Sequence, residues 1–262
     1  MRADQLLVQR GLAESRTLAR RMIESGRVTA DGLPVRKPAA ELDEAAVLSV
    51  AAGDEDRYVS RGGLKLAGAL AATGVAPKGL VCLDVGQSTG GFTDCLLQAG
   101  AAHVVGIDVG HSQLHPRLAG HPRITCIEGV NARAIDASAF GTGMPAKGFD
   151  LIVVDVSFIS LALVLPALAR LAAPDGVLLA LAKPQFEVGR DGVDKRGLVR
   201  SPALYEDVRT RLLTAARDAG WLPLAWLDSP ITGGDGNHEF FIHARRAPDQ
   251  KASPQDSPDI TP

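Results

Sequence analysis

Short apolar runs alternate with helical patterns along the chain from residue 80 onward. The apolar runs predict strands near residues 80–85, 103–107, 124–128, 150–155, 177–183, 222–228 and 239–244. The patterns between them predict helices near residues 91–99, 112–118, 158–172 and 202–220. Strands that alternate with helices are typical of a parallel α/β sheet. Because no helix separates the last two strands, we expect the loop 229–238 to join antiparallel neighbours, and Pro223 favours an edge or near-edge position.

The first fifty residues carry a different pattern, which predicts a small α+β domain. Ser15 is suited to cap a helix over Arg16–Ser25, and Gly26 is suited to end it. Leu18, Met22 and Ile23 fall at helical spacing and should face a core. Short apolar runs on either side of an Asp-Gly turn then predict a β-hairpin over residues 28–35, and a further strand follows over 47–50.

These patterns divide the chain into four parts. The parts are a small N-terminal domain over 1–52, a linker over 53–60, an α/β domain over 61–246 and a polar, proline-rich, disordered tail over 247–262. The α/β part opens with Arg-Gly-Gly-Leu-Lys at the start of a helix that runs to about Thr73. From local sequence alone, Lys65 on its first turn reads as a solvated lysine.

An acidic residue and a glycine-rich turn follow the first α/β strand, in LDVGQSTGGFTD over residues 83–94. The spacing lacks the glycine positions of a dinucleotide fingerprint and the lysine of a triphosphate loop. The looser turn that remains is the kind that S-adenosylmethionine (SAM) enzymes use. A turn without a ligand is the alternative, and the stretch alone favours a ligand by only about two to one. The cofactor-binding residues predicted here are Asp84, Gly86, Ser88, Gly90, Gly91, Phe92 and Thr93.

Polar residues also stand at the ends of the next predicted strands, where ligands bind in an open α/β sheet. Asp108 ends the second strand and could accept both ribose hydroxyls of an adenosyl group. Glu128 ends the third strand, and Asn131 follows it and could hydrogen-bond the adenine edge. Each acid could instead be a helix cap or a loop acid.

The fourth and fifth strands end in Asp155 and Lys183, and the reversed last strand begins beside Glu239 at the same edge. Lys183 follows a rigid apolar strand, where lysines are rarely placed unless they are paired. A lysine with carboxylates beside a SAM pocket suggests methyl transfer to a hydroxyl, with Lys183 as base or alkoxide stabiliser. The sequence shows no metal-ligand cluster, and the reaction requires no metal. A purely structural salt-bridge cluster remains the alternative, at about one chance in four.

Charge is distributed unevenly, with a net −2 over the chain but eight Lys/Arg against four acids over residues 1–37. An ordinary solvated helix face is one interpretation, and phosphate contacts to RNA are the other. The RNA-binding residues predicted in this segment are Arg2, Arg10, Arg16, Arg20, Arg27 and Lys37. The segment LLVQRGLAESRTLARRMIESGRVTADGLPVRKP resembles the S-four (αL) RNA-binding domain of ribosomal proteins, pseudouridine synthases and tRNA synthetases.

An apolar fraction of 46% supports a buried core. The three cysteines, Cys82, Cys95 and Cys126, form no metal-type cluster, and we interpret them as small core residues in a reducing compartment. The N-terminus lacks the apolar core of a signal peptide, and the most membrane-like run, Leu151–Ala173, splits into a strand and a helix. We therefore expect a cytoplasmic monomer with no membrane association.

Up to about residue 246, the chain resembles the TlyA family, also labelled haemolysin A. The motifs are SRGGLKL, DVGQSTGGFTDCLLQ, GIDVG-x-x-QL, VVDVSFIS, KPQFEVGR and SPI-x-GGDGN-x-EFF. The resemblance implies an S-four domain before an FtsJ-like domain of Rossmann-like methyltransferase fold, with seven strands and only the last reversed. It implies SAM-dependent 2′-O-methylation at cytidine in ribosomal RNA of the small or large subunit, or of both. The implied catalytic tetrad is Lys65, Asp155, Lys183 and Glu239, which changes the interpretation of Lys65.

Two segments match the family less well. Arg57-Tyr58-Val59 stands where the family has a short linker element, and the match is imperfect. We interpret the loop Gly189–Arg200 as an RNA-contacting flap that uses Arg190, Lys195 and Arg196. Two rival functions are a membrane-active cytolysin, which the lack of a signal peptide and of a spanning helix disfavours, and a non-catalytic ribosome assembly factor, which the intact tetrad positions disfavour.

Overall fold

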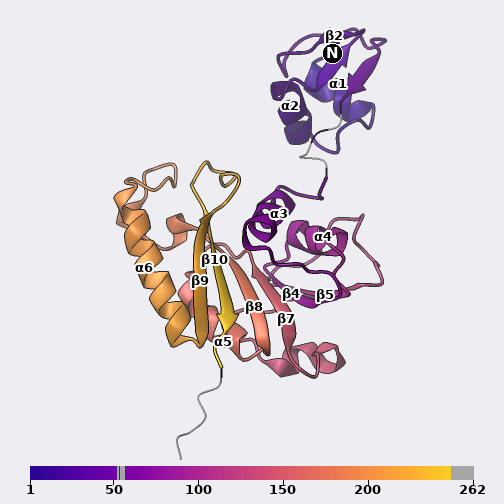
Figure 1. The fold of residues 1–262 in the computed structure, drawn as a ribbon. Coiled ribbons are helices and arrows are strands. Elements are labelled where there is room, and N and C mark those ends of the chain that lie inside the picture. Colours follow the sequence, from indigo (N-terminus) through magenta and orange to yellow (C-terminus); the bar gives the residue numbers. More distant parts are fainter. Residues whose placement is uncertain (52, 54–56, 249–262) are drawn as a thin grey trace, which may run out of the picture. The chain divides into compact units, whose positions relative to one another are not determined.

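The computed structural model describes residues 1–51, 53 and 57–248, in two compact units, Met1–Arg57 and Tyr58–Pro262 (Figure 1). Parts of the expected linker and tail, residues 54–56 and 249–262, lie outside the described residues. Tyr58 is buried in the second unit beneath Gly63, where a Cβ would lie 2.3 Å from the Tyr58 ring. Val59 N donates to Asp94 Oδ2 at 2.9 Å, so these two residues belong to the packing of the second unit.

The first unit packs two helices on a three-stranded antiparallel sheet of order β2-β1-β3. Its elements are α1 (Ala3–Gln9), α2 (Arg16–Glu24), β1 (Val28–Ala30), β2 (Leu33–Pro34) and β3 (Leu48–Val50). Ser15 Oγ accepts from Leu18 N at 3.2 Å, which confirms the predicted helix cap. Met22 and Ile23 are buried as predicted, whereas Leu18 is only half-buried because Ala19 takes the inward position.

The second unit is built on a seven-stranded sheet of order β6-β5-β4-β7-β8-β10-β9. Its strands are β4 (Val81–Val85), β5 (His103–Asp108), β6 (Ile124–Glu128), β7 (Phe149–Val154), β8 (Ala172–Ala182), β9 (Trp221–Asp228) and β10 (Phe240–Arg246). Only β10 is reversed, since it pairs antiparallel with both β8 and β9, which confirms the predicted fold. Pro223 lies on β9, which is an edge strand, as predicted.

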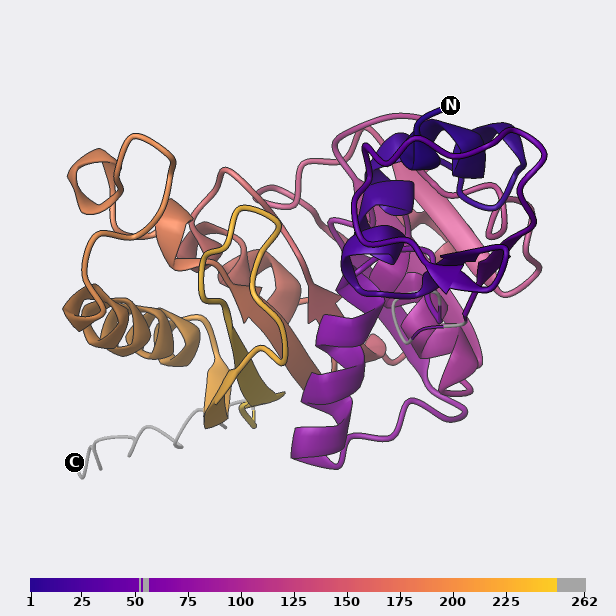
Figure 2. The ribbon, with the colours of Figure 1, turned by 90° about the horizontal axis from the view of Figure 1, so that it is seen from above.

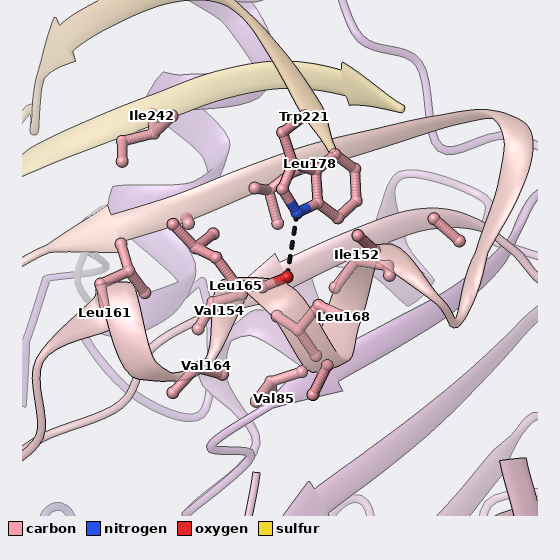
Figure 3. Packing of buried hydrophobic residues seen from close by; sticks show 14 of the residues in the cluster. Val85, Ile152, Val154, Leu161, Val164, Leu165, Leu168, Leu178, Trp221 and Ile242 are labelled. Carbon is pink, nitrogen blue, oxygen red and sulfur yellow. Dashed lines mark hydrogen bonds between the residues drawn. The ribbon is translucent and has the colours of Figure 1, made fainter. Parts of the chain in front are cut away.

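Helices cover both faces of this sheet (Figures 1 and 2). They are α3 (Gly62–Thr73), α4 (Gly91–Gln98), α5 (Leu165–Ala169) and α6 (Ala203–Asp218), with short 3-10 turns η2 (Ala137–Gly143), η3 (Leu161–Leu163), η4 (Pro184–Phe186) and η5 (Arg190–Gly192). Helices α3 and α4 pack with Phe241 on one face. On the other, Leu165 and Leu168 of α5 pack with Ile152 and with Trp221, whose Nε1 donates to Leu165 O at 3.1 Å (Figure 3).

One predicted helix is absent, and another is much shorter than predicted. Residues 112–118 form bends and turns, because Ser112 has φ +54° and Pro116 interrupts the segment. The helix expected over 158–172 is reduced to η3 and the short α5, because Phe158 has φ +63° and the chain is already in β8 at Ala172. Strand β8 starts early because Ala172 pairs with Phe149 of β7.

Cys82 and Cys95 are buried as predicted, whereas the core placement of Cys126 is wrong. Cys126 is exposed because β6 is the other edge strand of the sheet. The run Leu151–Ala173 holds most of β7, all of η3 and α5, and the start of β8, so it contains one strand more than the expected division into a strand and a helix. Within the described residues, no helix is long and apolar enough to cross a membrane.

Candidate active site

The carboxyl ends of β7 and β8 bring an acid and a lysine into contact. Asp155 follows β7, and Lys183 follows β8. Lys183 Nζ lies 2.6 Å from Asp155 Oδ1 and donates to Ser157 Oγ at 2.8 Å. The Lys183 side chain is 12% exposed, so its ammonium is mostly buried but open on one side.

A second ion pair joins Lys65 on the first turn of α3 to Glu239, which precedes β10. Both side chains are buried, at 9% and 3% exposed, so the solvated interpretation of Lys65 is wrong. Burial raises the pKa of Glu239, and the charge and hydrogen bond of Lys65 oppose that shift. Lys183 and Asp155 also act on the Glu239 pKa, in opposite directions, so the four predicted tetrad residues form one electrostatic cluster.

Two connected cavities adjoin this cluster. The smaller, of about 190 Å³, is lined by Lys65, Asp155 and Lys183 together with the glycine turn. The larger, of about 490 Å³, shares Gly86, Ser88, Asp155 and Ser157 with it. Its walls are mostly apolar, and they include Ile107, Val109, Val130, Phe158 and Ile159. The cavity that Lys65, Asp155 and Lys183 line therefore adjoins a larger and mostly apolar one.

Asp108 lines the larger cavity, and backbone donors fix the orientation of its carboxylate. Ser88 N donates to Oδ2 at 2.8 Å, and Gly110 N donates to Oδ1 at 2.7 Å. A carboxylate oxygen can accept further hydrogen bonds, so both remain suited to hydroxyl groups of a ligand. Asn131 lines the same cavity, whereas Glu128 lines neither cavity and instead accepts from Ser112 N at 2.6 Å.

The predicted glycine-turn residues divide into those that line the cavities and those that hold the turn. Gly86, Ser88, Gly91 and Phe92 line one or both cavities. Gly86 has φ +84°, and a Cβ there would lie 2.5 Å from Asp155 O, so only glycine lets the turn pack against β7. Gly90, at φ +90°, packs on Leu118 and lines neither cavity.

Asp84 and Thr93 support the glycine turn through a buried hydrogen-bond network. Thr93 Oγ1 donates to Asp84 Oδ2 at 2.6 Å, and Gln87 Nε2 donates to Thr93 Oγ1 at 2.9 Å. Asp84 is fully buried, and this burial raises its pKa to about 7. Neither residue lines either of the two cavities, so both support the turn through these side-chain hydrogen bonds.

Several predicted RNA-binding arginines of the first unit have structural partners. Arg2 and Arg16 each place a guanidinium nitrogen 3.0 Å from a carboxylate oxygen of buried Asp4. The hydrogen bonds from Arg2 hold the pKa of Asp4 at about 2. The other contacts join Arg10 to Glu44 O, Arg20 to Glu24 at 3.9 Å and Arg27 to Ala51 O at 2.8 Å, while Lys37 is exposed.

The basic loop Gly189–Arg200 is folded and anchored. Arg190 lies in η5, and Lys195 and Arg196 lie in a turn where Asp194 Oδ1 accepts from Arg196 N and Leu198 N. The buried Asn237 ties this turn to the loop before β10, since its Nδ2 donates to Gly197 O at 2.9 Å and its Oδ1 accepts from Val199 N at 3.0 Å. This basic loop is therefore held beside the residues that precede β10.

Sequence reasoning missed Glu187, which joins the two loops that carry Asp155 and Lys183. Glu187 Oε2 accepts from Ser160 Oγ and Oε1 from Leu161 N, each at 2.8 Å. Arg211 of α6 donates to Glu187 O at 2.6 Å. The glutamate in KPQFE, so close to a lysine at a strand end, was the only signal in the sequence. Ser157, Gln87 and Gln113, which line the cavities, were missed as well.

We expect Glu187→Ala to lower the free energy of unfolding by on the order of 3 kcal/mol, because it leaves the buried Leu161 N–H and the half-buried Ser160 hydroxyl without their acceptor. Urea denaturation of the variant and the wild type measures this difference. The matched control is Glu206→Ala, because Glu206 is exposed and its pair with Arg209 should contribute less than about 1 kcal/mol. Equal effects of the two substitutions would show that Glu187 does not join the loops.

Comparison with known proteins places this geometry in a family. The model of FtsJ-like methyltransferases matches residues 58–246, and the S4 domain model matches residues 1–48. The 16S/23S rRNA (cytidine-2'-O)-methyltransferase TlyA of Mycobacterium tuberculosis is 44% identical over 96% of this chain and 92% of its own. Hemolysin A of Brachyspira hyodysenteriae is 36% identical over 93% of this chain and 99% of its own.

Solved structures agree with the sequence comparison. A structure from Streptococcus thermophilus is 39% identical, has a TM-score of 0.73, and covers 94% of this chain and 88% of that chain. The tetrad motifs and the glycine turn lie within the segment that the methyltransferase model matches. The chain therefore belongs to the FtsJ-like methyltransferase family and carries an S4 domain at its N-terminus.

Proposed function

We propose that this protein transfers a methyl group from SAM to the ribose 2′-hydroxyl of a cytidine in ribosomal RNA. The observation that carries the proposal is the paired cluster of Lys65–Glu239 and Lys183–Asp155 beside the two connected cavities. The substrate is inferred from the relative in Mycobacterium tuberculosis, which is named for cytidine 2′-O-methylation of 16S and 23S rRNA.

The cavities fit SAM on their own chemistry. The apolar walls of the larger one suit the adenine ring, Asp108 would accept the ribose hydroxyls, and Asn131 would contact the base edge. Gly86 and Ser88 line both cavities and would lie under the methionine half. When bound, SAM supplies an electrophilic methyl group on a sulfonium, which is a good leaving group.

The residues of the chain would orient and activate the hydroxyl. Lys183 Nζ is held by Asp155 and Ser157 and lines the smaller cavity, where the ribose would enter. The 2′-oxygen would bond to the methyl carbon as the bond from that carbon to sulfur breaks, which leaves S-adenosylhomocysteine. The hydroxyl proton would pass to Lys183 Nζ in its neutral form, or to water while the Lys183 ammonium stabilises the alkoxide. Lys65, paired with Glu239, borders the same cavity and would hold the ribose.

We infer that the S4 domain (residues 1–52 in our division of the chain) docks the protein on ribosomal RNA in the cytoplasm. Its arginines can bind phosphates without reading sequence, which would position the methyltransferase unit on a subunit. Arg2 and Arg16 also stabilise the domain through Asp4, so Arg10, Arg20, Arg27 and Lys37 are the better candidates for contact. The loop with Arg190, Lys195 and Arg196 would provide a second contact near the reaction site.

The proposal is tested by incubating unmethylated ribosomal subunits with methyl-labelled SAM, followed by alkaline hydrolysis. A 2′-O-methyl group removes the nucleophile that cleaves the adjacent phosphodiester, so we expect the label in alkali-resistant dinucleotides. Subunits that are already methylated serve as the control and should take up no label. Label in mononucleotides would mean methylation of a base and would overturn the proposal.

A further inference from the structure

A third cavity, of about 440 Å³, lies between α6 and the adjoining ends of β9 and β10. It shares no lining residue with the two cavities of the candidate active site. Four of its lining residues carry aromatic rings: Tyr205 of α6, Trp226 of β9, Phe240 of β10 and His238 just before β10. We call these four residues and the space they line the aromatic pocket.

The rings of the aromatic pocket are arranged as stacked and edge-on pairs. Trp226 stacks on Phe240 with ring centroids 5.1 Å apart and planes inclined by 27°. Tyr205 meets Phe240 edge-on at 5.4 Å, and His238 lies 6.1 Å from Tyr205. Phe240 is buried, whereas Trp226 and Tyr205 are only half-buried and His238 is exposed. An additional planar ring could therefore stack against side chains that are already fixed in place.

Charged residues at the edge of the aromatic pocket, Arg209 and Asp228, can bind the phosphate and the base edge of a nucleotide. Arg209 of α6 is exposed and contacts Glu206 through Nη1 at 3.3 Å. A guanidinium has five N–H donors, so Arg209 can also bind a phosphate. Asp228, also exposed, can accept from an exocyclic amine of a base. Aromatic rings beside a cation are the combination that proteins use to bind unpaired bases.

The aromatic pocket is connected to the candidate active site through β10. His238 directly precedes Glu239, and Phe240 pairs with Ala182, the residue before Lys183. Asn237, one residue before His238, holds the basic loop through Gly197 and Val199. The basic loop and the aromatic pocket are thus both joined to the residues around Glu239 and Lys183, where the RNA strand would bind.

We propose that the aromatic pocket binds an unpaired nucleobase of the RNA substrate, outside the nucleotide that is methylated. This inference rests on the proposed function, because that function brings RNA to this edge of the sheet. Stacking by Trp226 and Tyr205 provides affinity for any base, and Arg209 holds the adjoining phosphate. The target nucleotide itself remains at Lys183.

Tryptophan fluorescence tests this placement because the chain has only Trp221 and Trp226. Trp221 is buried in the core and hydrogen-bonded to Leu165 O, so it cannot stack on RNA (Figure 3). We expect single-stranded RNA oligonucleotides to quench the emission of the full chain, and the same sequence as a duplex to quench it less. In Trp226→Phe, the remaining emission of Trp221 should not respond. Equal quenching in this variant, or none in the wild type, would overturn the proposal.

Kinetics provides the second test. We expect Trp226→Leu to raise the KM for ribosomal subunits about tenfold, with kcat and SAM affinity unchanged, because one stacked base is lost. Arg209 is an exposed residue at the edge of the pocket. We expect Arg209→Ala to raise the KM for ribosomal subunits as well, without affecting folding. The matched control is Leu224→Ala, since Leu224 is exposed on β9 outside the pocket and should leave the KM unchanged. An unchanged KM in both pocket variants would overturn the proposal.

The two tests separate this inference from the proposed function. If the wild type binds RNA with Trp226 quenching but transfers no methyl group, the proposed function fails and the pocket stands. If the wild type methylates subunits and the pocket variants do so with unchanged KM, the pocket fails and the proposed function stands.

Discussion

Replacing Lys183 with alanine is expected to slow methyl transfer by a factor of about 100 to 10,000, with binding of SAM and RNA retained. Lys183 Nζ is a mostly buried cation that lines the smaller cavity, and Asp155 and Ser157 fix its position. Under the proposed mechanism, the substitution removes the group that accepts the proton of the 2′-hydroxyl or stabilises the alkoxide. Single-turnover transfer of labelled methyl to ribosomal subunits measures the rate, and calorimetry measures SAM affinity.

A second variant, Lys183→Arg, separates the two roles that are open for this lysine. Arginine keeps a positive charge near Asp155 but does not give up its proton in proteins. If Lys183 is the base, the arginine variant should be as slow as the alanine variant; if it stabilises the alkoxide, the arginine variant should recover much of the rate. Lys147→Ala, at an exposed lysine, is the control. A wild-type rate in Lys183→Ala would remove Lys183 from the reaction.

The sequence predicted the architecture of the second unit because strand-forming runs and strand ends leave strong local signals. Asp108, Asp155 and Lys183 all follow apolar runs, and the rule that ligands bind beyond strand ends was enough to bring them together. Lys65 shows the limit of local reasoning. Its neighbours predict a solvated lysine, and only the fold buries it against Glu239, which is 174 residues later in the chain.

The features that were missed depend on contacts between distant segments. Glu187 joins two loops through Ser160 and Leu161, and neither partner is marked by periodicity. The aromatic pocket combines Tyr205 of α6, Trp226 of β9 and His238 of the loop before β10, so no short motif contains it. The exposure of Cys126 follows from the edge position of β6, which strand patterns do not reveal. The local pattern of apolar and polar residues predicts helices and strands. Which side chains are buried, and which partners they contact, depends on segments that are distant in the sequence.

Asp84→Asn is expected to stabilise the protein in neutral and alkaline solution. Burial raises the pKa of Asp84 to about 7 from an ordinary value of 3.8, and Oδ1 has no hydrogen-bond partner within the described part of the chain. Between about pH 4 and pH 7, the folded state keeps a proton that the unfolded state releases. The free energy of unfolding therefore falls as pH rises through this window, and the penalty is complete above pH 7.

Asparagine carries no titrating proton, and its side-chain oxygen can still accept from Thr93. The free energy of unfolding of the variant should therefore lack this slope. At pH 8 it should exceed that of the wild type by up to about 4 kcal/mol, because a pKa of about 7 lies roughly three above the ordinary value of 3.8. Urea denaturation at intervals from pH 4 to pH 8 measures both curves. Asp175→Asn is the control, because Asp175 is exposed and the substitution should leave the slope unchanged. Parallel curves for the wild type and Asp84→Asn would show that Asp84 is ionised in the folded protein throughout this range, and that its charge is compensated within the turn.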